Sequence, residues 1–184
     1  EFAYRMRTGQ RDNQQFGLIA LGLFKDQEEI DNSPEQTFGP VRPGDVKYQD
    51  VNEDGVIDAN DEMPIGYSNI PEIIYGFGTQ FIWKGFDLGF FFRGQANVSY
   101  ALGGSTFIPF SEGVGKGNVF EKALDRWTPE NPNPNAFYPR HSDGRSTNNW
   151  QRSSRNIYDG SLLRLADIEL GYPFNKKLFS HLGI

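Results

Sequence analysis

Two neighbouring stretches of the chain alternate between large apolar residues and small or polar residues with a period of two. In residues 73–83 the large apolar side chains share one face, and these are Ile73, Tyr75, Phe77, Phe81 and Trp83. In residues 86–95 the corresponding face carries Phe86, Leu88, Phe90 and Phe92. The opposite faces carry Gly76, Gly78 and Gln80, then Asp87, Gly89, Arg93 and Gln95, with Phe91 as the exception. This period predicts two β-strands, and the break at Lys84-Gly85 predicts a hairpin.

A third strand is predicted over residues 161–172, where the alternation is less regular. Leu162, Ile168 and Leu170 are expected on its apolar face, with Asp167 opposite them. Residues 1–7 are interpreted as the end of a further strand, so the chain is expected to be part of something longer. Each strand of the hairpin is about as long as the roughly 9–11 residues that a tilted strand needs to cross a bilayer.

Strands of this kind occur in soluble β-sandwiches and in transmembrane β-barrels, and two features favour the barrel. The face opposite the rings carries glycine and charge, which suits a water-filled lumen. Aromatic residues also gather at one end of the strands, as in the girdles at membrane interfaces, and these are Trp83, Phe86, Tyr172 and Phe174. The predicted fold is therefore all-β, with these strands forming part of an antiparallel transmembrane β-barrel.

The lengths of the connections support the same interpretation. The hairpin turn has two residues, whereas long polar segments rich in Pro, Gly and Asn separate the hairpin from the strands on either side. Long structureless loops are rare in compact soluble folds, but outer-membrane barrels alternate short periplasmic turns with long extracellular loops. This parity places residues 50–61 and 96–160 outside the cell and Lys84-Gly85 in the periplasm.

Composition excludes several classes of function. The chain has no cysteine, so it has no disulfide, zinc-thiolate site or thiol nucleophile of its own. Its formal net charge is −6, which is opposite to the basic footprint of a nucleic-acid-binding protein. Its apolar content lies largely in rings, since aromatic residues make up 15% of the chain. No apolar run approaches the roughly 20 residues of a transmembrane helix.

The strongest motif for chemistry is the acidic segment 50–61, DVNEDGVIDAND. Its spacing is that of an EF-hand-type loop that wraps one Ca²⁺, with a glycine at the sixth position for the sharp turn. The predicted ligands are the side chains of Asp50, Asn52, Asp54 and Asp61, the carbonyl of Val56, and Asp58 either directly or through a water. Closely spaced carboxylates repel one another unless a cation lies between them, which favours a metal over the alternative of an acidic turn without one.

The surroundings of this segment indicate what the calcium would do. The twelfth position is Asp61 where Glu is usual, so its bidentate reach is shorter. No strong amphipathic helix flanks the segment, which argues against a calcium-sensing helix pair. A structural calcium that fixes an external loop is therefore the prediction.

No catalytic constellation emerges from the sequence, and the chain is not expected to be an enzyme. The two histidines, His141 and His181, lie in loop-like surroundings and are interpreted as surface or end-of-strand residues rather than metal ligands. Four rings of the long loops could contact glycan or a protein partner, or could pack on one another, and these are Phe107, Phe110, Phe137 and Trp150. Self-packing is the expectation for these rings.

Five sequence blocks, in the same order, resemble the SusC/RagA family of TonB-dependent outer-membrane transporters. The acidic segment lies in the first of them, PGDVKYQDVNEDGVIDANDEMPIG, and the hairpin in the second, YGF…KGFDL…FFRG. The others are RWTPENPNPNAFYPR, LLRLADIELGYPF and, before the acidic segment, FGLIALGLFKDQEEID. Together they cover most of the chain.

The resemblance implies a large closed barrel of 22 strands with a plug domain inside, typical of Bacteroidetes. It also implies that residues 1–184 form part of the C-terminal half of that barrel. It further implies import of oligosaccharides or peptides, driven by TonB acting on the plug, together with a SusD-like surface lipoprotein. The implied surroundings are the lipid bilayer of the outer membrane, and no nucleic acid. An alternative is a secreted or surface β-sandwich that binds or degrades glycans and carries a dockerin-like calcium loop. A calcium-stiffened adhesin is a third possibility, but it lacks the expected internal repeat.

Overall fold

The computed structural model describes residues 2–104, 107–110, 119–142 and 146–174. By contacts the chain divides into two compact units, which are taken here one at a time. The sheet unit comprises Pro71–Val98 and Gly160–Ile184, and the loop unit comprises Glu1–Ile70 and Ser99–Asp159. None of the helices in the described part of the chain is both long enough and apolar enough to span a membrane.

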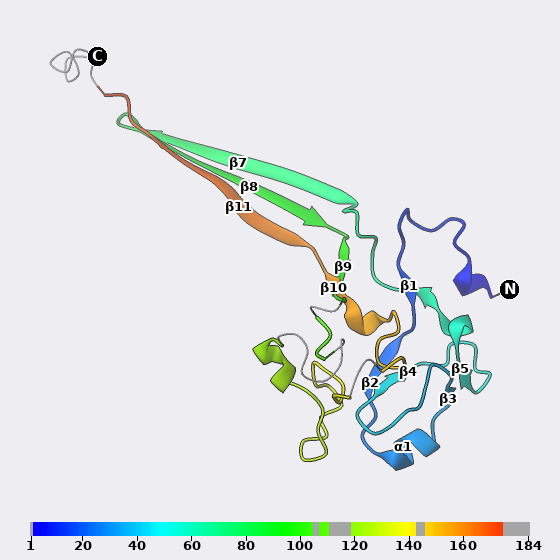
Figure 1. Ribbon diagram of the computed structural model, residues 1–184. Coiled ribbons are helices and arrows are strands. Elements are labelled where there is room, and N and C mark those ends of the chain that lie inside the picture. Colours follow the sequence, from blue (N-terminus) through cyan, green and yellow to red (C-terminus); the bar gives the residue numbers. More distant parts are fainter. Residues whose placement is uncertain (1, 105–106, 111–118, 143–145, 175–184) are drawn as a thin grey trace. The chain divides into compact units, whose positions relative to one another are not determined.

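The sheet unit is built on three antiparallel strands (Figure 1). Strands β7 (Ile73–Trp83) and β8 (Phe86–Ala96) form the predicted hairpin, and β11 (Leu162–Gly171) pairs with the other edge of β8. Lys84 and Gly85 both have positive φ, 49° and 88°. Positive φ at both central positions defines a type I′ turn, whose twist matches that of the flanking strands. The sequence prediction of the hairpin and its turn is confirmed.

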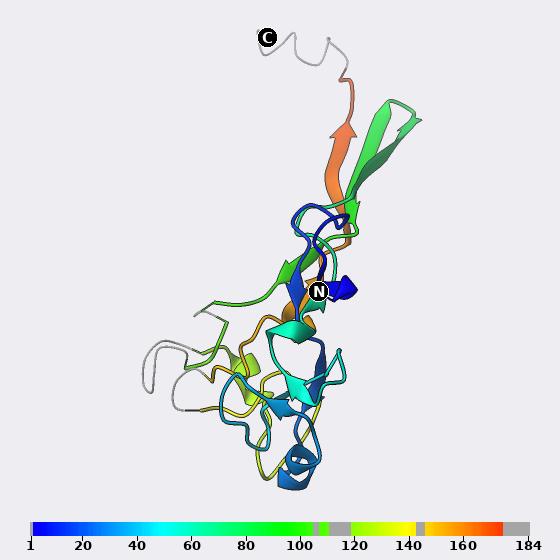
Figure 2. The same ribbon diagram turned by 90° about the vertical axis from the view of Figure 1, so that its right-hand side faces the viewer.

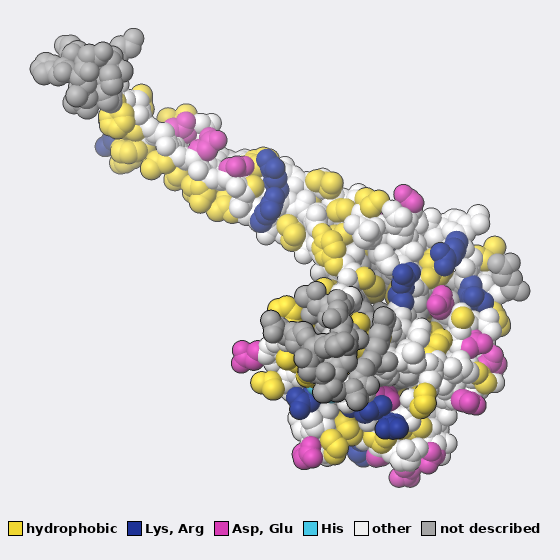
Figure 3. Space-filling model, viewed as in Figure 1, with side chains coloured by type: hydrophobic (Ala, Val, Ile, Leu, Met, Phe, Trp, Pro, Cys, Tyr) yellow, Lys and Arg dark blue, Asp and Glu magenta, His cyan; other side chains and the backbone are white. Residues whose placement is uncertain are grey.

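The register places most of the large apolar side chains of the three strands on one face, whereas Ile74, Ile82, Phe91 and Leu162 lie on the other. Phe77 lies opposite Phe92 with their rings stacked at 5.2 Å, and Leu165 pairs with Phe92 on the other side. Most of this face is exposed, including Ile73, Phe77, Phe81, Trp83, Phe86, Leu163, Leu165, Ile168 and Leu170. Figure 3 shows hydrophobic side chains running along the sheet, apart from its charged groups. Such an extended apolar surface marks a contact with lipid or protein.

The third strand exists as predicted, but its faces differ from the expectation. The register of β11 against β8 shifts between Leu165 and Asp167, so the strand contains an irregularity at Ala166. One extra residue reverses the alternation. Leu162 therefore pairs with Gln95 on the polar face, and the apolar face is formed by Leu163, Leu165, Ile168 and Leu170. The placement of Leu162 on the apolar face was wrong for this reason.

The other face of the sheet is more polar, although Ile74 and Ile82 lie exposed on it, and the ring of Phe91 lies there in a slot made by two glycines. A Cβ atom on Gly76 or Gly78 would lie 3.0 or 2.9 Å from the Phe91 ring. The Arg93 guanidinium lies 5.4 Å from the same ring centroid and 4.0 Å from the Asp167 carboxylate. The glycines are thus needed on this face because they leave room for one large side chain.

The ends of the sheet are defined by its register. The hairpin turn and the C-terminal end of β11 lie at the same end, where Gly171 pairs with Asp87 (Figures 1 and 2). At the other end Ile73 pairs with Ala96, and Leu162 pairs with Gln95. The chain therefore leaves the sheet for the loop unit at this second end each time.

The loop unit contains short elements joined by turns. Its N-terminal segment contains η1 (Ala3–Arg5), β1 (Phe16–Gly17), β2 (Ala20–Leu23), α1 (Gln27–Asp31), β3 (Glu35–Gln36), β4 (Val46–Tyr48), β5 (Val56–Ile57), η2 (Ala59–Asp61) and β6 (Met63–Pro64). Its second segment contains β9 (Ser99–Ala101), η3 (Glu121–Leu124), η4 (Ser154–Asn156) and β10 (Ile157–Asp159). The expected strand over residues 1–7 is wrong for the described residues, since Ala3–Arg5 is a 3-10 helix.

The long polar segments are not structureless, because they share a small hydrophobic core. Both segments of the loop unit contribute buried side chains to it, namely Leu18, Leu23, Val46, Tyr48 and Ile57 from the first and Trp127 and Ala136 from the second. The sequence suggested loops here because these apolar residues are too widely spaced to form a periodic pattern.

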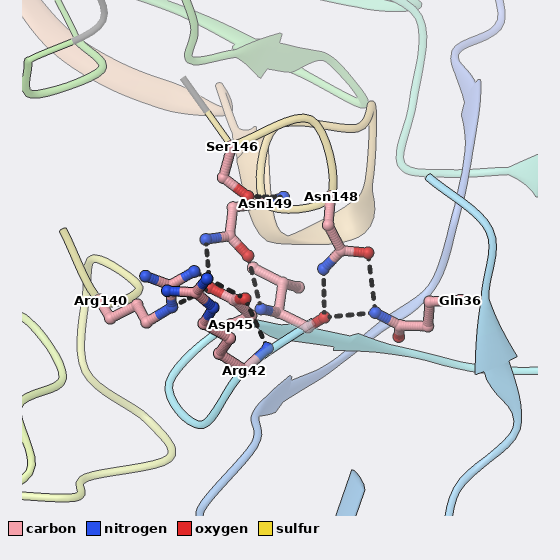
Figure 4. Close-up of polar contacts among 8 residues, drawn as sticks. Gln36, Arg42, Asp45, Arg140, Ser146, Asn148 and Asn149 are labelled. Carbon is pink, nitrogen blue, oxygen red and sulfur yellow. Dashed lines mark hydrogen bonds and ion pairs between the residues drawn. The ribbon is translucent and has the colours of Figure 1, made fainter. Parts of the chain in front are cut away.

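Buried polar side chains complete this core around β4 (Figure 4). The Asp45 carboxylate is fully buried and lies 2.7 Å from Arg140 Nε. It also accepts hydrogen bonds from Asn149 Nδ2 and from the backbone N–H of Arg42, both at 2.8 Å. Asn149 Oδ1 in turn accepts the N–H of Val46 at 2.9 Å. The carboxylate thus has the partners that a buried charge requires.

Amide side chains also pair with the backbone of β4 as a neighbouring strand would. The carbonyl of Val46 accepts from Gln36 Nε2 at 2.9 Å and from Asn148 Nδ2 at 3.0 Å. The N–H of Tyr48 donates to Gln36 Oε1 at 2.8 Å, and the Tyr48 hydroxyl donates to the carbonyl of Asn148 at 2.7 Å. Burial raises the pKa of the Tyr48 hydroxyl. These side-chain partners satisfy backbone groups of β4 that would otherwise be buried without hydrogen bonds.

Three of the four loop rings noted in the sequence contact other rings. Phe107 lies 6.3 Å from Phe137 between ring centroids, and Phe137 lies 4.9 Å from Tyr138. Phe110 lies 5.1 Å from the His141 ring. Trp150 is half-buried. Self-packing is thus confirmed for Phe107, Phe110 and Phe137.

Candidate functional site

The acidic segment 50–61 follows directly after β4 and closes on itself as a compact loop. β5 lies inside it and pairs in parallel with β3, while η2 forms its last turn. Gly55, at the sixth position, has φ +86°, and a Cβ atom there would meet no heavy atom within 4 Å. The glycine is therefore required by the backbone conformation alone, as the motif predicts.

The first half of the loop is organised around the Asp50 carboxylate. Its two oxygens accept the N–H of Glu53 at 2.7 Å and the N–H of Gly55 at 2.8 Å. Asp54 accepts the N–H of Val56 at 2.9 Å and a hydrogen bond from Asn52 Nδ2 at 2.9 Å. The backbone therefore wraps around the side chains at the first, third and fifth positions of the motif.

The second half of the loop is fixed by Asp58 and Asp61. Asp61 is fully buried, and its oxygens accept the N–H groups of Val51 and Asp58, both at 2.8 Å. Asp58 caps η2 by accepting the N–H of Asn60 at 2.6 Å. Asp61 therefore links the backbone of Val51 and Asp58, the second and ninth positions of the motif. The short side chain of Asp at the twelfth position is long enough to make both hydrogen bonds.

The N-terminal 3-10 helix is attached to this loop. The Tyr4 hydroxyl donates to the carbonyl of Asn60 at 2.7 Å, and the Arg5 guanidinium donates to Asn60 Oδ1 at 2.7 Å. The pKa of Tyr4 is raised, first by burial of its hydroxyl and then by the negative charge of Asp61, with Asp54 and Asp58 contributing less and Arg5 opposing. Tyr4 thus reports the negative potential of the acidic loop.

The donor chemistry of the loop suits a hard cation, because Ca²⁺ prefers carboxylate, amide and carbonyl oxygens. The six predicted ligands are all oxygen donors, and five of them lie in the tight turns just described. Their carboxylates accept backbone N–H groups, and across the described residues no three His, Cys, Asp or Glu side chains are grouped closely enough to share a metal ion. The loop is therefore organised by hydrogen bonds, with Asn52 and the Val56 carbonyl as its additional oxygen donors.

Reasoning from the sequence did not find the buried polar group around Asp45. It also did not find a surface hollow that the Trp127 indole lines together with Pro43, Pro129 and Pro132. The available signal was Pro43-Gly44, a dipeptide that marks a turn. Arg42, Pro43, Gly44 and Asp45 form that turn, closed by the hydrogen bond from Asp45 N–H to the Arg42 carbonyl at 3.0 Å. Of the histidines, His141 is half-buried and its Nε2 atom has no hydrogen-bond partner, while His181 lies outside the described residues.

Comparison of sequences places the chain beside TonB-dependent receptors. TonB-dependent receptor P26 of Formosa agariphila is 37% identical over 157 residues, which are 85% of this chain and 15% of that protein. TonB-dependent receptor P3 of the same organism is 28% identical over 182 residues, which are 97% of this chain and 17% of that protein. No family model matches the chain. The chain thus spans about a sixth of the length of these relatives.

Comparison of structures agrees with the comparison of sequences and concerns the fold. The RagAB peptide importer in its open-open state matches with a TM-score of 0.58 and 20% identity, over 90% of this chain and 16% of that one. The closed-closed state matches with a TM-score of 0.55 and 19% identity, over 90% of this chain and 17% of that one. At this identity the likeness concerns the fold. The three-stranded sheet is therefore part of a large antiparallel β-barrel, as the alternation of its strands predicted.

Proposed function

The chain belongs to the TonB-dependent receptors, and from this premise we propose that it forms barrel wall and outer loops of a SusC/RagA-type nutrient importer in the outer membrane. The proposed activity is TonB-dependent import of oligosaccharides, or alternatively of peptides, and no bond is made or broken. The observation that carries the proposal is the sheet unit, which has one exposed apolar face and one polar face.

The length of the strands fits a bilayer. Each strand of the hairpin has 11 residues, and at about 3.4 Å per residue it is about 37 Å long. A tilt of about 45° leaves about 26 Å along the membrane normal, close to the roughly 25 Å apolar band of outer-membrane barrels. The apolar face would then contact lipid, and the face with Arg93, Asp167 and the Phe91 slot would face the lumen.

The ends of the sheet support the proposed topology. The two-residue turn lies at one end, which suits the periplasmic side, and every connection to the loop unit leaves from the other end. Residues 50–61 and 96–160 would accordingly be extracellular. This assignment follows the rule that outer-membrane barrels have short periplasmic turns and long external loops.

Partners and substrate are proposed from similarity. RagAB is a peptide importer, and the sequence blocks resemble the SusC group, which suggests oligosaccharides as the first substrate class to test. The proposed partners are a SusD-like surface lipoprotein above the external loops, and TonB, which would act through a plug region. An enzymatic role is not proposed.

We also propose that the acidic loop binds one structural Ca²⁺. Asp50, Asn52, Asp54, Asp58 and Asp61 would provide side-chain oxygens and Val56 its carbonyl. Bound calcium would offset the repulsion between four aspartates and stiffen a loop that buries little apolar surface. It would therefore hold the segment between β4 and β6 in one conformation.

Calcium binding can be tested with two variants that remove the same charge. Asp54→Asn replaces the carboxylate of a proposed ligand by a weaker, uncharged amide oxygen, whereas Glu53→Gln removes a neighbouring carboxylate at the fourth position, which the motif does not use. Isothermal titration of the full-length protein with calcium should show affinity lowered at least tenfold in Asp54→Asn and changed less than threefold in Glu53→Gln. Equal affinity of Asp54→Asn and the parent would exclude the ligand assignment, and equal losses in both variants would reduce it to general electrostatics.

The transporter proposal is tested first by fractionation of cells and by gel mobility of the full-length protein with and without boiling. A closed barrel resists detergent, so the protein is expected in the outer membrane with a band that shifts on boiling. A soluble band without a shift would refute the barrel. It would leave the secreted calcium-bearing β-sandwich as the function to pursue.

A further inference from the structure

A hollow of about 570 Å³ in the loop unit is lined mainly by apolar surface. Its wall includes the indole of Trp127 and the rings of Pro43, Pro129 and Pro132. Flat apolar rings with a few polar groups at the edge are the usual lining of a small-molecule site. The acidic loop contributes no residue to this hollow, so the two are separate features of the loop unit.

The rings of the wall are held rigidly. Gly44 has φ +86° and lies so close to the indole that a Cβ atom there would be 2.3 Å from Trp127 Cε3. The backbone N–H of Trp127 donates to the carbonyl of Tyr138 at 3.1 Å. Paired hydrogen bonds between Thr128 and Asn131, at 3.3 and 3.0 Å, close the turn that carries Pro129. A preformed wall lowers the entropy cost of binding a ligand.

Three cations and one carboxylate, Asp26, line the hollow, so its net charge is positive. Arg140 is held by Asp45, and Lys25 lies 3.4 Å from the Asp26 carboxylate. Arg42 is exposed, and within the described residues its guanidinium has no hydrogen bond or ion pair. Figure 4 shows Arg42 beside the Asp45–Arg140 pair. Since the other two cations are each matched by a carboxylate, Arg42 is the cation available to a ligand.

The backbone of Arg42 is fixed, which gives its side chain a defined origin. Pro43 and Gly44 are the central residues of a turn in which the Arg42 carbonyl accepts the N–H of Asp45 at 3.0 Å. Proline followed by a residue with positive φ is the pattern of a type II turn. The N–H of Arg42 also donates to Asp45 Oδ2 at 2.8 Å. The guanidinium thus extends from a rigid turn and offers the fork of donors that suits a carboxylate or sulfate.

We propose that this hollow binds an acidic saccharide at the outer surface of the transporter. An apolar ring face of the sugar would lie against the indole and the proline rings, and a carboxylate or sulfate on the sugar would pair with Arg42. An acidic peptide without proline or aromatic residues would satisfy the charge but would not place a rigid ring against the proline-lined wall. This inference rests on the proposed function, since it gives the imported class of nutrient an initial binding site.

The test uses the full-length protein purified in detergent and calorimetric titration with four probes. These are hyaluronan tetrasaccharide, which carries carboxylates, chondroitin 4-sulfate tetrasaccharide, which adds sulfates, neutral chitotetraose, and tetraglutamate as an acidic peptide. At least one acidic saccharide is expected to bind at least tenfold more tightly than chitotetraose and tetraglutamate. The better of the two saccharides distinguishes carboxylate from sulfate as the recognised anion.

Two variants locate the binding. Arg42→Gln should weaken binding of the acidic saccharide at least tenfold, whereas Lys84→Gln, which removes the same charge at the hairpin turn, should change it less than twofold. Arg42 is exposed, so its replacement is not expected to disturb folding, and circular dichroism verifies this. Equal affinity for chitotetraose, equal affinity for tetraglutamate, no binding of either acidic saccharide, or full retention of binding in Arg42→Gln would each overturn the proposal.

Failure of this inference and failure of the proposed function give different results. A preparation that shows the heat-shifted band and uptake but does not bind an acidic saccharide overturns the binding site and leaves the transporter intact. A preparation without the heat-shifted band refutes the transporter whatever the titration shows.

Discussion

Removal of the Asp45 carboxylate should open the loop unit locally. In Asp45→Ala the Arg140 guanidinium, whose side chain is only 21% exposed, loses its partner. The N–H of Arg42 and the amide of Asn149 lose their acceptor as well. Breaking a buried ion pair from one side costs about 3–5 kcal/mol. Because Arg140 retains some contact with water, we expect a value of about 3 kcal/mol, at the lower end of this range.

Hydrogen exchange measures this loss of local stability at the backbone N–H groups around Asp45. The N–H of Val46 donates to Asn149 Oδ1, whose orientation depends on Asp45. At about 1.4 kcal/mol per factor of ten, a loss of about 3 kcal/mol should speed exchange around Val46 about a hundredfold. The measurement is exchange followed by mass spectrometry on a peptide covering residues 42–49 of the full-length protein.

Two further variants make the result specific. Asp45→Asn keeps one acceptor oxygen and should recover part of the protection. Asp31→Ala removes a carboxylate whose one hydrogen bond, from Gln27, is exposed, and it should change exchange in residues 42–49 less than threefold. If Asp45→Ala also changed this exchange less than threefold, the interpretation of Asp45 as the centre of the buried group would be refuted.

Three other predictions follow from single positions. The added methyl group of Gly55→Ala meets no neighbour, so only the positive φ lowers the free energy of unfolding, by about 1 kcal/mol. The methyl group of Gly44→Ala also collides with the Trp127 indole, so this variant should lose more than twice as much in thermal unfolding of the loop unit. The pKa of His141 is lowered, first by burial and then by the charge of Arg126. Because the unfolded chain therefore binds a proton at higher pH than the folded chain, the stability of the loop unit should fall as the pH drops below about 6.5. Unfolding scans at pH 7.5 and 5.5 should show this loss in the parent and not in His141→Gln. Ile168→Arg places a charge on the apolar face and should destabilise the barrel by about 2–4 kcal/mol, which would reduce the amount of the heat-shifted band. Glu169→Arg, on the polar face, should leave the band unchanged. Equal losses of the band in both variants would contradict the assignment of the faces.

The sheet could be predicted closely from the sequence because its signals are local. Alternation of apolar and polar residues defines a strand whatever its surroundings, and Lys84-Gly85 allows the positive φ that a type I′ turn needs. The faces of β11 could not be predicted as well. The irregularity at Ala166 depends on the pairing of that strand with β8, and no local signal in β11 marks it.

The loop unit was harder to predict because its order comes from contacts between distant residues. Gln36 and Asn148 are polar residues that appear typical of loops, yet they take the place of a neighbouring strand beside β4. For the candidate calcium site, the spacing predicted the turns and the need for Gly55, and the structure has both. The number of carboxylates that point toward one another depends on side-chain geometry, which spacing alone does not define.

The shared core of the loop unit has an evolutionary consequence. Trp127 and Ala136 pack with Val46 and Tyr48, although the hairpin separates the two segments in the sequence. Recombination that exchanged only one segment between relatives would pair surfaces that had not diverged together. The two segments of the loop unit should therefore be inherited as a matched pair, while the hairpin between them can change on its exposed apolar face.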